Sequence, residues 1–261
     1  MQTLQTGGVT LHIRDEGPKD GRPLVFSNSL GTDLRVWDAL LPHLPEGLRL
    51  VRYDKRGHGL SDASPAPYAM ETLVADAEAV CDGLGLSGVT FVGLSIGGLI
   101  GQGLAAKRPD LLRALVLMDT AAKIGTAEMW DDRIAKITAG GVSALADPIL
   151  ERWFTRDFRE AAPEFALWSN MLTRTSVAGY TGCCAAIAGA DMTESTRALT
   201  LPVLAMAGDQ DGSTPPDLVK ATAELSNAAF HVIPGAGHLP CIEQPEATAA
   251  LIAAFLKDTA A

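Results

Sequence analysis

The residues best suited to chemistry in this chain are a serine and its flanking glycines, Gly93-Leu94-Ser95-Ile96-Gly97. The apolar run Val89 to Leu94 before the serine predicts a strand, and the Gly/Ala-rich run Gly98 to Lys107 after it predicts a helix. A sharp turn between strand and helix lifts a serine hydroxyl toward a base, and glycines two residues away remove side chains that would collide there. The first helix amides would face a developing oxyanion. The pattern predicts that Ser95 is a nucleophile.

A serine nucleophile needs a base within hydrogen-bond reach. His238 follows the predicted strand Phe230 to Ile233 and ends the segment Gly235-Ala236-Gly237-His238. Flanking glycines indicate a tightly turned loop, which suits a proton shuttle better than a core histidine. The remaining histidines lie in strand-like runs, a Pro-flanked helix end or a turn: His12, His231, His43 and His58. His238 is therefore the predicted base.

The base in turn needs a carboxylate that holds its ring. Three aspartates that follow predicted strands are candidates, in the order of preference Asp211, Asp119 and Asp209. Asp211 follows the strand predicted at Val203 to Ala207. This places it at the same edge of the sheet as Ser95 and His238, although it could also cap the helix near Pro215 to Leu225.

Two backbone amides are expected to bind the oxyanion of an acyl-transfer reaction. One belongs to Ile96, directly after the nucleophile, and the other to the loop after the strand Leu24 to Phe26. That loop reads Ser27-Asn28-Ser29-Leu30-Gly31, and we favour the Leu30 amide. An ordinary polar loop would have the same composition, so this second donor needs a structural test.

One segment that reads as a helix, Met129 to Thr138, combines a cation with apolar residues. Trp130, Ile134 and Ile137 form one stripe, and Arg133 lies on the same side. A guanidinium on an apolar face either binds an anion or extends its charged end into water, and both interpretations stay open. Trp130 is expected to line a substrate pocket, although helix stripes of this kind also form plain core.

The elements that must position these residues indicate an α/β protein. Apolar runs alternate with helix-like segments, which predicts a mostly parallel central sheet with helices on both faces. The predicted strands are Val9 to Ile13, Leu24 to Phe26, Leu48 to Tyr53, Val89 to Leu94, Ala114 to Met118, Val203 to Ala207 and Phe230 to Ile233. Between them, residues 121–199 show helical periodicity alone. We predict a core of residues 1–120 and 200–261 and an inserted helical cap of residues 121–199.

Composition excludes several classes of protein. The chain has 21 Lys and Arg against 31 Asp and Glu, a net charge of −10, which disfavours nucleic acid as a partner. The charge-free stretch Gly88 to Ala106 fits a strand and a helix better than a membrane span because it is rich in glycine. Met1 to Ile13 lacks the features of a signal peptide, and the four cysteines have no metal or disulfide spacing. We expect a cytoplasmic protein without a metal, and the oligomeric state is not predicted.

Over essentially its whole length the chain resembles the Ser-type α/β-hydrolases, including the order Ser, Asp, His. Several segments resemble the 3-oxoadipate enol-lactonases in particular: Phe26-Ser27-Asn28-Ser29-Leu30-Gly31-Thr32, Trp37, Asp54-Lys55-Arg56-Gly57-His58-Gly59, Gly93-Leu94-Ser95-Ile96-Gly97-Gly98, and Met129-Trp130 with Arg133. The serine motif marks only the fold. The Ser-Asn-Ser-Leu-Gly segment, by contrast, replaces the His-Gly pair usual in this loop, and that departure points to the enol-lactonases.

The resemblance implies opening of a small anionic lactone in the β-ketoadipate route of aromatic catabolism, by Ser95, His238 and Asp211, without a cofactor. The same three residues would also serve a carboxylesterase or a carbon–carbon bond hydrolase. A binding protein that only captures a small ligand on this fold is a further alternative. Haloalkane dehalogenases and epoxide hydrolases are disfavoured, because they have aspartate at the position of Ser95.

Overall fold

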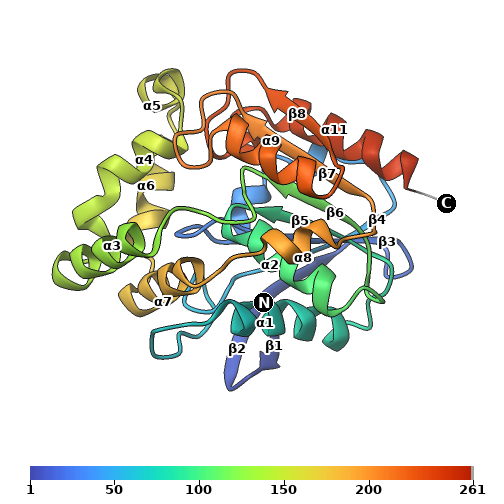
Figure 1. The fold of residues 1–261 in the computed structure, drawn as a ribbon, viewed down its shortest axis with the longest axis horizontal. Coiled ribbons are helices and arrows are strands. Elements are labelled where there is room, and N and C mark those ends of the chain that lie inside the picture. The colour runs from blue at the N-terminus through green and yellow to red at the C-terminus, as the bar shows by residue number, and fades with distance from the viewer. Residues whose placement is uncertain (260–261) are drawn as a thin grey trace.

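The computed structural model describes residues 1–259, and their strands form an eight-stranded sheet in the order β1-β2-β4-β3-β5-β6-β7-β8 (Figure 1). β1 (Gln2–Thr6) and β2 (Val9–Glu16) form an antiparallel hairpin, and β2 also pairs antiparallel with β4. The other strands run parallel: β4 (Leu48–Tyr53), β3 (Arg22–Ser27), β5 (Val89–Leu94), β6 (Leu112–Met118), β7 (Val203–Gly208) and β8 (Ala229–Ile233). The predicted mostly parallel sheet is confirmed.

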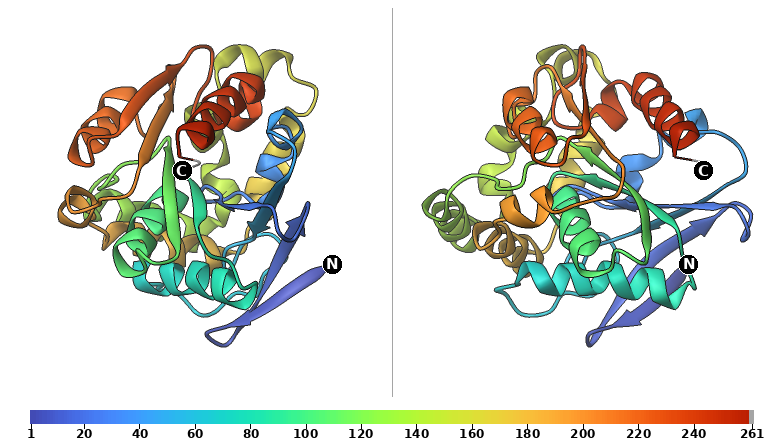
Figure 2. Two further views of the ribbon diagram at one scale, coloured as in Figure 1. Left: turned by 90° about the vertical axis from the view of Figure 1, so that its right-hand side faces the viewer. Right: turned by 45° about the vertical axis from the view of Figure 1, so that its right-hand side comes forward.

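Helices cover both faces of the sheet, which explains why its central strands are apolar along their whole length. Every residue of β5 and β7 is buried. α1 (Met70–Gly83) and α2 (Ile96–Lys107) pack together on one face, and α11 (Pro245–Asp258) lies on the opposite face (Figure 2). The remaining helices of the core are short: η1 (Leu34–Trp37), η2 (Leu41–His43), α9 (Pro216–Leu225) and α10 (Pro240–Glu243).

Each predicted strand lies within an observed one, but the sequence analysis missed β1. Gln2, Thr3 and Gln5 of this edge strand are exposed. A strand with so few buried side chains lacks the apolar run or clean alternation by which strands are recognised. Its pairing with β2 supplies the order that its own composition does not indicate.

The regular elements between β6 and β7 are all helical; α3 to α7 lie along one side of the molecule, whereas α8 lies beside α2 (Figure 1). They are α3 (Ala127–Gly140), η3 (Val142–Leu145), α4 (Ala146–Trp153), α5 (Arg156–Ala161), α6 (Phe165–Thr173), α7 (Val177–Ala188) and α8 (Thr193–Arg197). We call residues 127–197 the cap. Within residues 1–259, no helix has both the length and the apolar character needed to cross a membrane.

Candidate active site

Ser95 lies on the turn that joins β5 directly to α2, with φ 57° and ψ −119°. L-residues rarely adopt this conformation, and such strain concentrates at functional sites. α2 begins at Ile96, two residues earlier than predicted. A Cβ added to Gly93 would lie 2.4 Å from the Gly97 carbonyl oxygen, and one added to Gly97 would lie 1.9 Å from that of Ser27. The turn therefore needs glycine on both sides of the serine.

The strained backbone of Ser95 is held by hydrogen bonds from three directions. Its N–H donates to the Met118 carbonyl at the end of β6, at 2.9 Å. Its carbonyl oxygen accepts from Thr120 Oγ1 at 2.6 Å and from the Gly98 N–H at 2.8 Å. These contacts fix the serine at the start of α2, at the carboxyl edge of the sheet.

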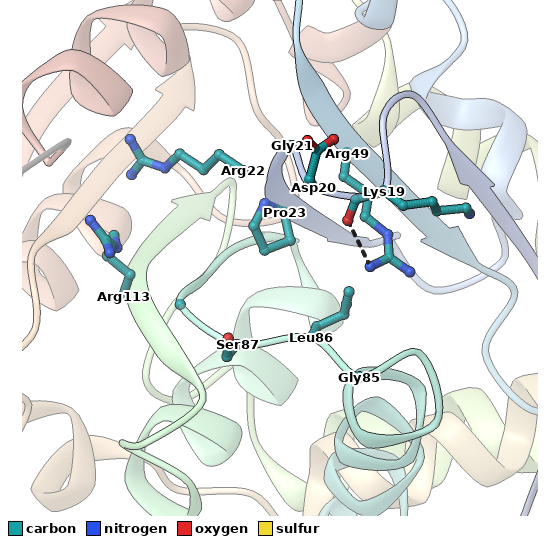
Figure 3. Close-up of a pocket in the computed structure, with 11 residues that line it drawn as sticks. Lys19, Asp20, Gly21, Arg22, Pro23, Arg49, Gly85, Leu86, Ser87 and Arg113 are labelled. Carbon is teal, nitrogen blue, oxygen red and sulfur yellow. Dashed lines mark hydrogen bonds between the residues drawn. The ribbon is translucent and has the colours of Figure 1, made fainter.

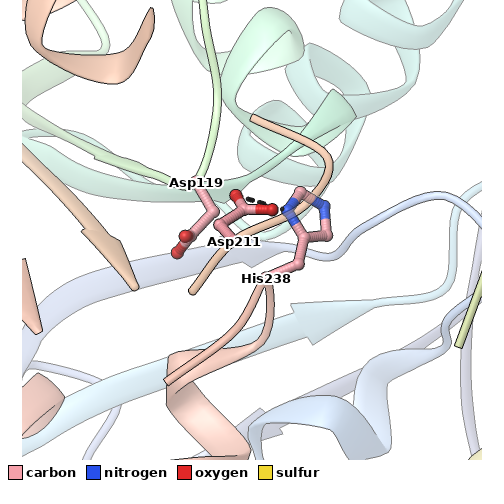
Figure 4. Close-up of side chains that lie close together, drawn as sticks. All are labelled: Asp119, Asp211 and His238. Carbon is pink, nitrogen blue, oxygen red and sulfur yellow. Dashed lines mark hydrogen bonds and ion pairs between the residues drawn. The ribbon is translucent and has the colours of Figure 1, made fainter. Parts of the chain in front are cut away.

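Asp211 and His238 form a buried hydrogen-bonded pair at the same edge, with 2.9 Å between Asp211 Oδ2 and His238 Nδ1 (Figure 4). Thr214 Oγ1 donates to the same carboxylate oxygen at 2.6 Å, and the Ser213 N–H donates to Oδ1 at 2.7 Å. Burial alone would raise the pKa of Asp211, but the charge and hydrogen bonds around it, led by His238, lower that pKa. The carboxylate thus stays ionised against the imidazole ring.

Asp119, the second candidate for this carboxylate, lies on the far side of Asp211 from the ring (Figure 4). One carboxylate oxygen of Asp119, one of Asp211 and one ring nitrogen of His238 lie within 4.8 Å of one another. Asp119 Oδ1 accepts from the Gly208 N–H at 2.9 Å, whereas Oδ2 has no hydrogen-bond partner among the described residues. Burial, followed by the negative charge of Asp211, raises the pKa of Asp119. A carboxyl that resists ionisation is a weak partner for an imidazolium, and among the described residues it is Asp211 that bonds to the ring, so both arguments favour Asp211.

Asp209, the third candidate, has a different role. Its Oδ1 accepts from the N–H groups of Gly235 and Ala236, at 2.9 and 3.2 Å. Asp209 therefore holds the backbone of the loop that ends in His238 and does not bond to the ring.

The second ring nitrogen, His238 Nε2, faces the loop after β3. Its hydrogen bond within residues 1–259 is with Ser29 Oγ at 3.4 Å and not with Ser95. The sequence analysis considered only the backbone of this loop and missed the Ser29 side chain. No local signal marks it, because the contact joins residues far apart in the chain.

The two amides predicted to bind an oxyanion are both open. Within residues 1–259, neither the Leu30 N–H nor the Ile96 N–H donates a hydrogen bond to another residue. Ile96 is the first residue of α2, where helix amides lack an internal acceptor. Both residues are buried, and buried amides without a partner are rare in folded proteins. An oxyanion between the β3 loop and α2 would satisfy such donors.

Arg133 and Trp130 lie together on α3. The guanidinium carbon of Arg133 is 4.8 Å from the centroid of the Trp130 ring, a cation–π contact. Trp130 is 5% exposed, and its Nε1 donates to the Ile124 carbonyl at 2.7 Å. This hydrogen bond anchors the indole beneath the guanidinium.

Tyr180 on α7 links Arg133 to the β3 loop. Burial raises the pKa of Tyr180, and the positive charge of the neighbouring Arg133 opposes that rise. The Tyr180 ring is also a near neighbour of Gly31, because a Cβ added to Gly31 would lie 3.0 Å from Tyr180 Cε2. The sequence analysis missed Tyr180, since α7 is apolar all round and no stripe singles it out.

The cap lies directly on the loops that carry these residues. The same Cβ on Gly31 would lie 2.7 Å from Leu172 Cδ1 and 3.2 Å from a ring atom of Trp153. The Trp153 carbonyl accepts from the His238 N–H at 2.8 Å. Cap residues therefore contact both the predicted oxyanion loop and the histidine loop.

A separate pocket lined by basic side chains lies at the opposite edge of the sheet (Figure 3). Arg22, Arg49 and Arg113 line it from the amino ends of their strands. Ser95 and His238 follow the carboxyl ends of β5 and β8 instead. This pocket and the candidate active site therefore lie at opposite ends of the strands.

Comparison with known proteins agrees with this geometry. Residues 24–251 match the alpha/beta hydrolase family. The chain belongs to the alpha/beta hydrolase family. The resemblance noted in its sequence is thereby confirmed at the level of the family.

Two relatives extend the match to the enol-lactonases. The chain is 35% identical to 3-oxoadipate enol-lactonase 2 of Acinetobacter baylyi, over 98% of this hydrolase and 96% of that protein. The crystal structure of the enol-lactonase from Burkholderia xenovorans LB400 is also 35% identical, with a TM-score of 0.95 over 98% of this chain and all of that one. A thermophilic esterase from Thermogutta terrifontis is 28% identical, with a TM-score of 0.92 over 99% and 98% of the two chains.

Proposed function

We propose that this hydrolase opens 3-oxoadipate enol-lactone to 3-oxoadipate through an acyl-enzyme on Ser95. The observation that carries the proposal is the buried Asp211–His238 pair at the sheet edge where the strained Ser95 turn also lies. Enol-lactonase relatives at 35% identity over nearly the whole chain support the choice of substrate. The reaction needs no metal or organic cofactor, and we assign it to the cytoplasm.

In the proposed mechanism, His238 Nε2 accepts the Ser95 proton as Oγ attacks the lactone carbonyl. Asp211 orients the ring and stabilises the imidazolium. Hydrogen bonds in unliganded active sites are commonly long and shorten when substrate binds, so the ring would exchange its 3.4 Å contact with Ser29 for Ser95. The Leu30 and Ile96 amides bind the oxyanion.

Collapse of the tetrahedral intermediate breaks the bond between the carbonyl carbon and the ring oxygen. The leaving oxygen takes the proton from His238 and departs as an enol, which remains tethered to the acyl chain and tautomerises to a ketone. This makes it a better leaving group than a simple alkoxide. Water activated by His238 then cleaves the acyl-enzyme and releases the keto-diacid.

The substrate carries a carboxylate, which a protein with net charge −10 would repel unless a cation lies near the site. We assign that role to Arg133, with Trp130 beneath its guanidinium. Tyr180 connects this cation to Gly31 of the oxyanion loop.

Replacement of the nucleophile tests the proposal. Ser95→Ala should reduce hydrolysis of the enol-lactone, followed by the loss of its ultraviolet absorbance, by on the order of 10⁴-fold or more. The matched control is Ser87→Ala, an exposed serine near the basic pocket, which should retain wild-type turnover. Undiminished turnover by a folded Ser95→Ala variant would refute the mechanism.

A carboxylesterase is the second candidate, favoured by the likeness to the Thermogutta terrifontis esterase. The two functions differ in kcat/KM for the anionic lactone and for a neutral ester such as p-nitrophenyl acetate. An enol-lactonase should prefer the lactone, whereas a preference for the neutral ester would favour the esterase. A protein that only binds ligands would turn over neither.

A further inference from the structure

Lys55 is a buried cation that the proposed mechanism does not use. It follows β4, in the segment Asp54-Lys55-Arg56-Gly57-His58-Gly59, and is 1% exposed. Its Nζ donates to the carbonyl oxygens of Asn28 and Ser29, at 2.8 and 2.9 Å. Among residues 1–259, no carboxylate oxygen lies within 4.0 Å of Lys55 Nζ, so its ammonium forms no ion pair with them. Burying an ammonium without a carboxylate partner is costly, so packing alone is a poor reason for a lysine here.

Of the two carbonyls that Lys55 binds, that of Ser29 belongs to the same peptide group as the Leu30 N–H. The Ser29–Leu30 peptide is trans, so its C=O and N–H point in opposite directions in one plane. A donor that fixes the carbonyl therefore also fixes the direction of the N–H. Because hydrogen bonds in a chain polarise one another, an ammonium on the carbonyl also makes the N–H a stronger donor.

Lys55 shares the Ser29 carbonyl with Thr32, whose Oγ1 and N–H donate to it at 2.9 and 3.3 Å, but Lys55 is the charged donor of the three. The next amide of the loop, the Gly31 N–H, donates to His58 Nε2 at 3.0 Å, which leaves the Leu30 amide open. Burial, followed by the charge of Lys55, lowers the pKa of His58 to about 3, so its ring is neutral and can accept. The segment after β4 thus supports the loop after β3 at two points.

We propose that Lys55 is a positioning residue for the oxyanion hole, which orients and polarises the Leu30 N–H through the Ser29 carbonyl. Lys55 does not touch the substrate and acts only through this peptide group. The inference rests on the proposed acyl transfer to Ser95 but not on the identity of the lactone.

The charge on Lys55 gives this role a pH dependence. Burial lowers the pKa of Lys55 to about 8, and the negative charges of Asp54 and Asp33 partly oppose that effect. Burial raises the pKa of the Cys183 thiol to about 12, so this neighbour is neutral at that pH. The charge of Lys55 in turn lowers the pKa of His58 and opposes the rise that burial causes in the pKa of Cys183. Above this pH the neutral amine can still donate a hydrogen bond, but the polarising charge is lost.

The test uses the full chain, with p-nitrophenyl acetate as substrate. Lys55→Met removes charge and donors, Lys55→Gln restores a neutral donor, and Lys220→Met replaces an exposed lysine as control. We expect Lys55→Met to lower kcat by about 100-fold, the cost of one oxyanion donor, with KM within about twofold. Lys55→Gln should recover part of kcat, and Lys220→Met should match the wild type.

The pH profile of kcat separates positioning from simple structural support. The wild type should lose activity on a limb with an apparent pKa near 8, and Lys55→Gln should lack that limb. An unchanged kcat in both folded variants, or the same limb in Lys55→Gln as in the wild type, would overturn the inference. Undiminished turnover by a folded Ser95→Ala variant would instead overturn the proposed function, so the two failures are distinguishable.

Discussion

At the scale of single residues, Arg133 is the side chain on which selectivity for an anionic lactone would depend. Its guanidinium lies 4.8 Å from the Trp130 ring and close to Tyr180, which contacts the loop around Gly31. A carboxylate bound by Arg133 would hold the other end of a small lactone near the oxyanion amides. A neutral ester has no group that could use this contact.

Arg133→Ala should therefore raise KM for the enol-lactone by about 10-fold to 100-fold, the range expected for lost hydrogen bonds to a charged group. KM for p-nitrophenyl acetate should change little. Arg156→Ala, an exposed arginine of the cap, serves as the control. An equal rise in KM for both substrates would remove Arg133 from carboxylate binding.

Local sequence predicted some site residues and not others, for a physical reason. Ser95, Asp211 and His238 follow strands in glycine-rich or short loops, and that local pattern predicts their place at the sheet edge. Tyr180, inside α7, has no such pattern, and the pattern around Lys55 does not indicate what its side chain contacts. Their roles depend on which loops and helices lie side by side, and only the assembled fold brings Lys55 to the Ser29 carbonyl.

At the scale of the elements, Glu243 of α10 joins the histidine loop to the cap. Its Oε2 accepts from the Gly237 N–H at 2.7 Å, and its Oε1 accepts from the Thr155 N–H at 3.0 Å and from Thr155 Oγ1 at 2.6 Å. Burial raises the pKa of Glu243, and these hydrogen bonds oppose the rise. One carboxylate therefore holds the start of α5 against the residue before His238.

Glu243→Gln should weaken this junction, because an amide has only one accepting oxygen and its NH₂ would face a donor. We expect a loss of about 1 to 3 kcal/mol in the free energy of unfolding, the cost of a buried donor left unpaired. Thermal unfolding measures it, with Glu224→Gln on the exposed face of α9 as control. An unfolding transition identical to that of the wild type would show that the contact does not stabilise the fold.

Element type was easier to predict than element packing. Apolar runs in the sequence predict the buried strands, and the spacing of apolar residues predicts the amphipathic stripe of α3. Its main neighbour, α7, was not, because helical periodicity tells which face is apolar but not what covers it. The exposed edge strand β1 has too few apolar residues for the sequence to predict either its presence or its packing.

At the scale of the whole molecule, the parallel sheet gathers the chemistry at one edge. Leu30, Lys55, Ser95, Asp211 and His238 all follow the carboxyl ends of strands. Open α/β sheets bind their ligands at this edge, because the loops there converge. Alternation of strands and helices was enough to predict it, whereas the division into a core of residues 1–120 and 200–261 and a cap of residues 121–199 stays a prediction.

The most direct test of the account is the site of modification by a phosphonyl fluoride, which bonds phosphorus to an activated serine oxygen and releases fluoride. Peptide mass spectrometry should find one phosphonyl group per chain, on Ser95, appearing in step with the loss of lactone hydrolysis. The His238→Ala variant should remain unlabelled over the same time. Loss of activity with the label on a different residue, or labelling of His238→Ala at the wild-type rate, would contradict a Ser95 nucleophile activated by His238.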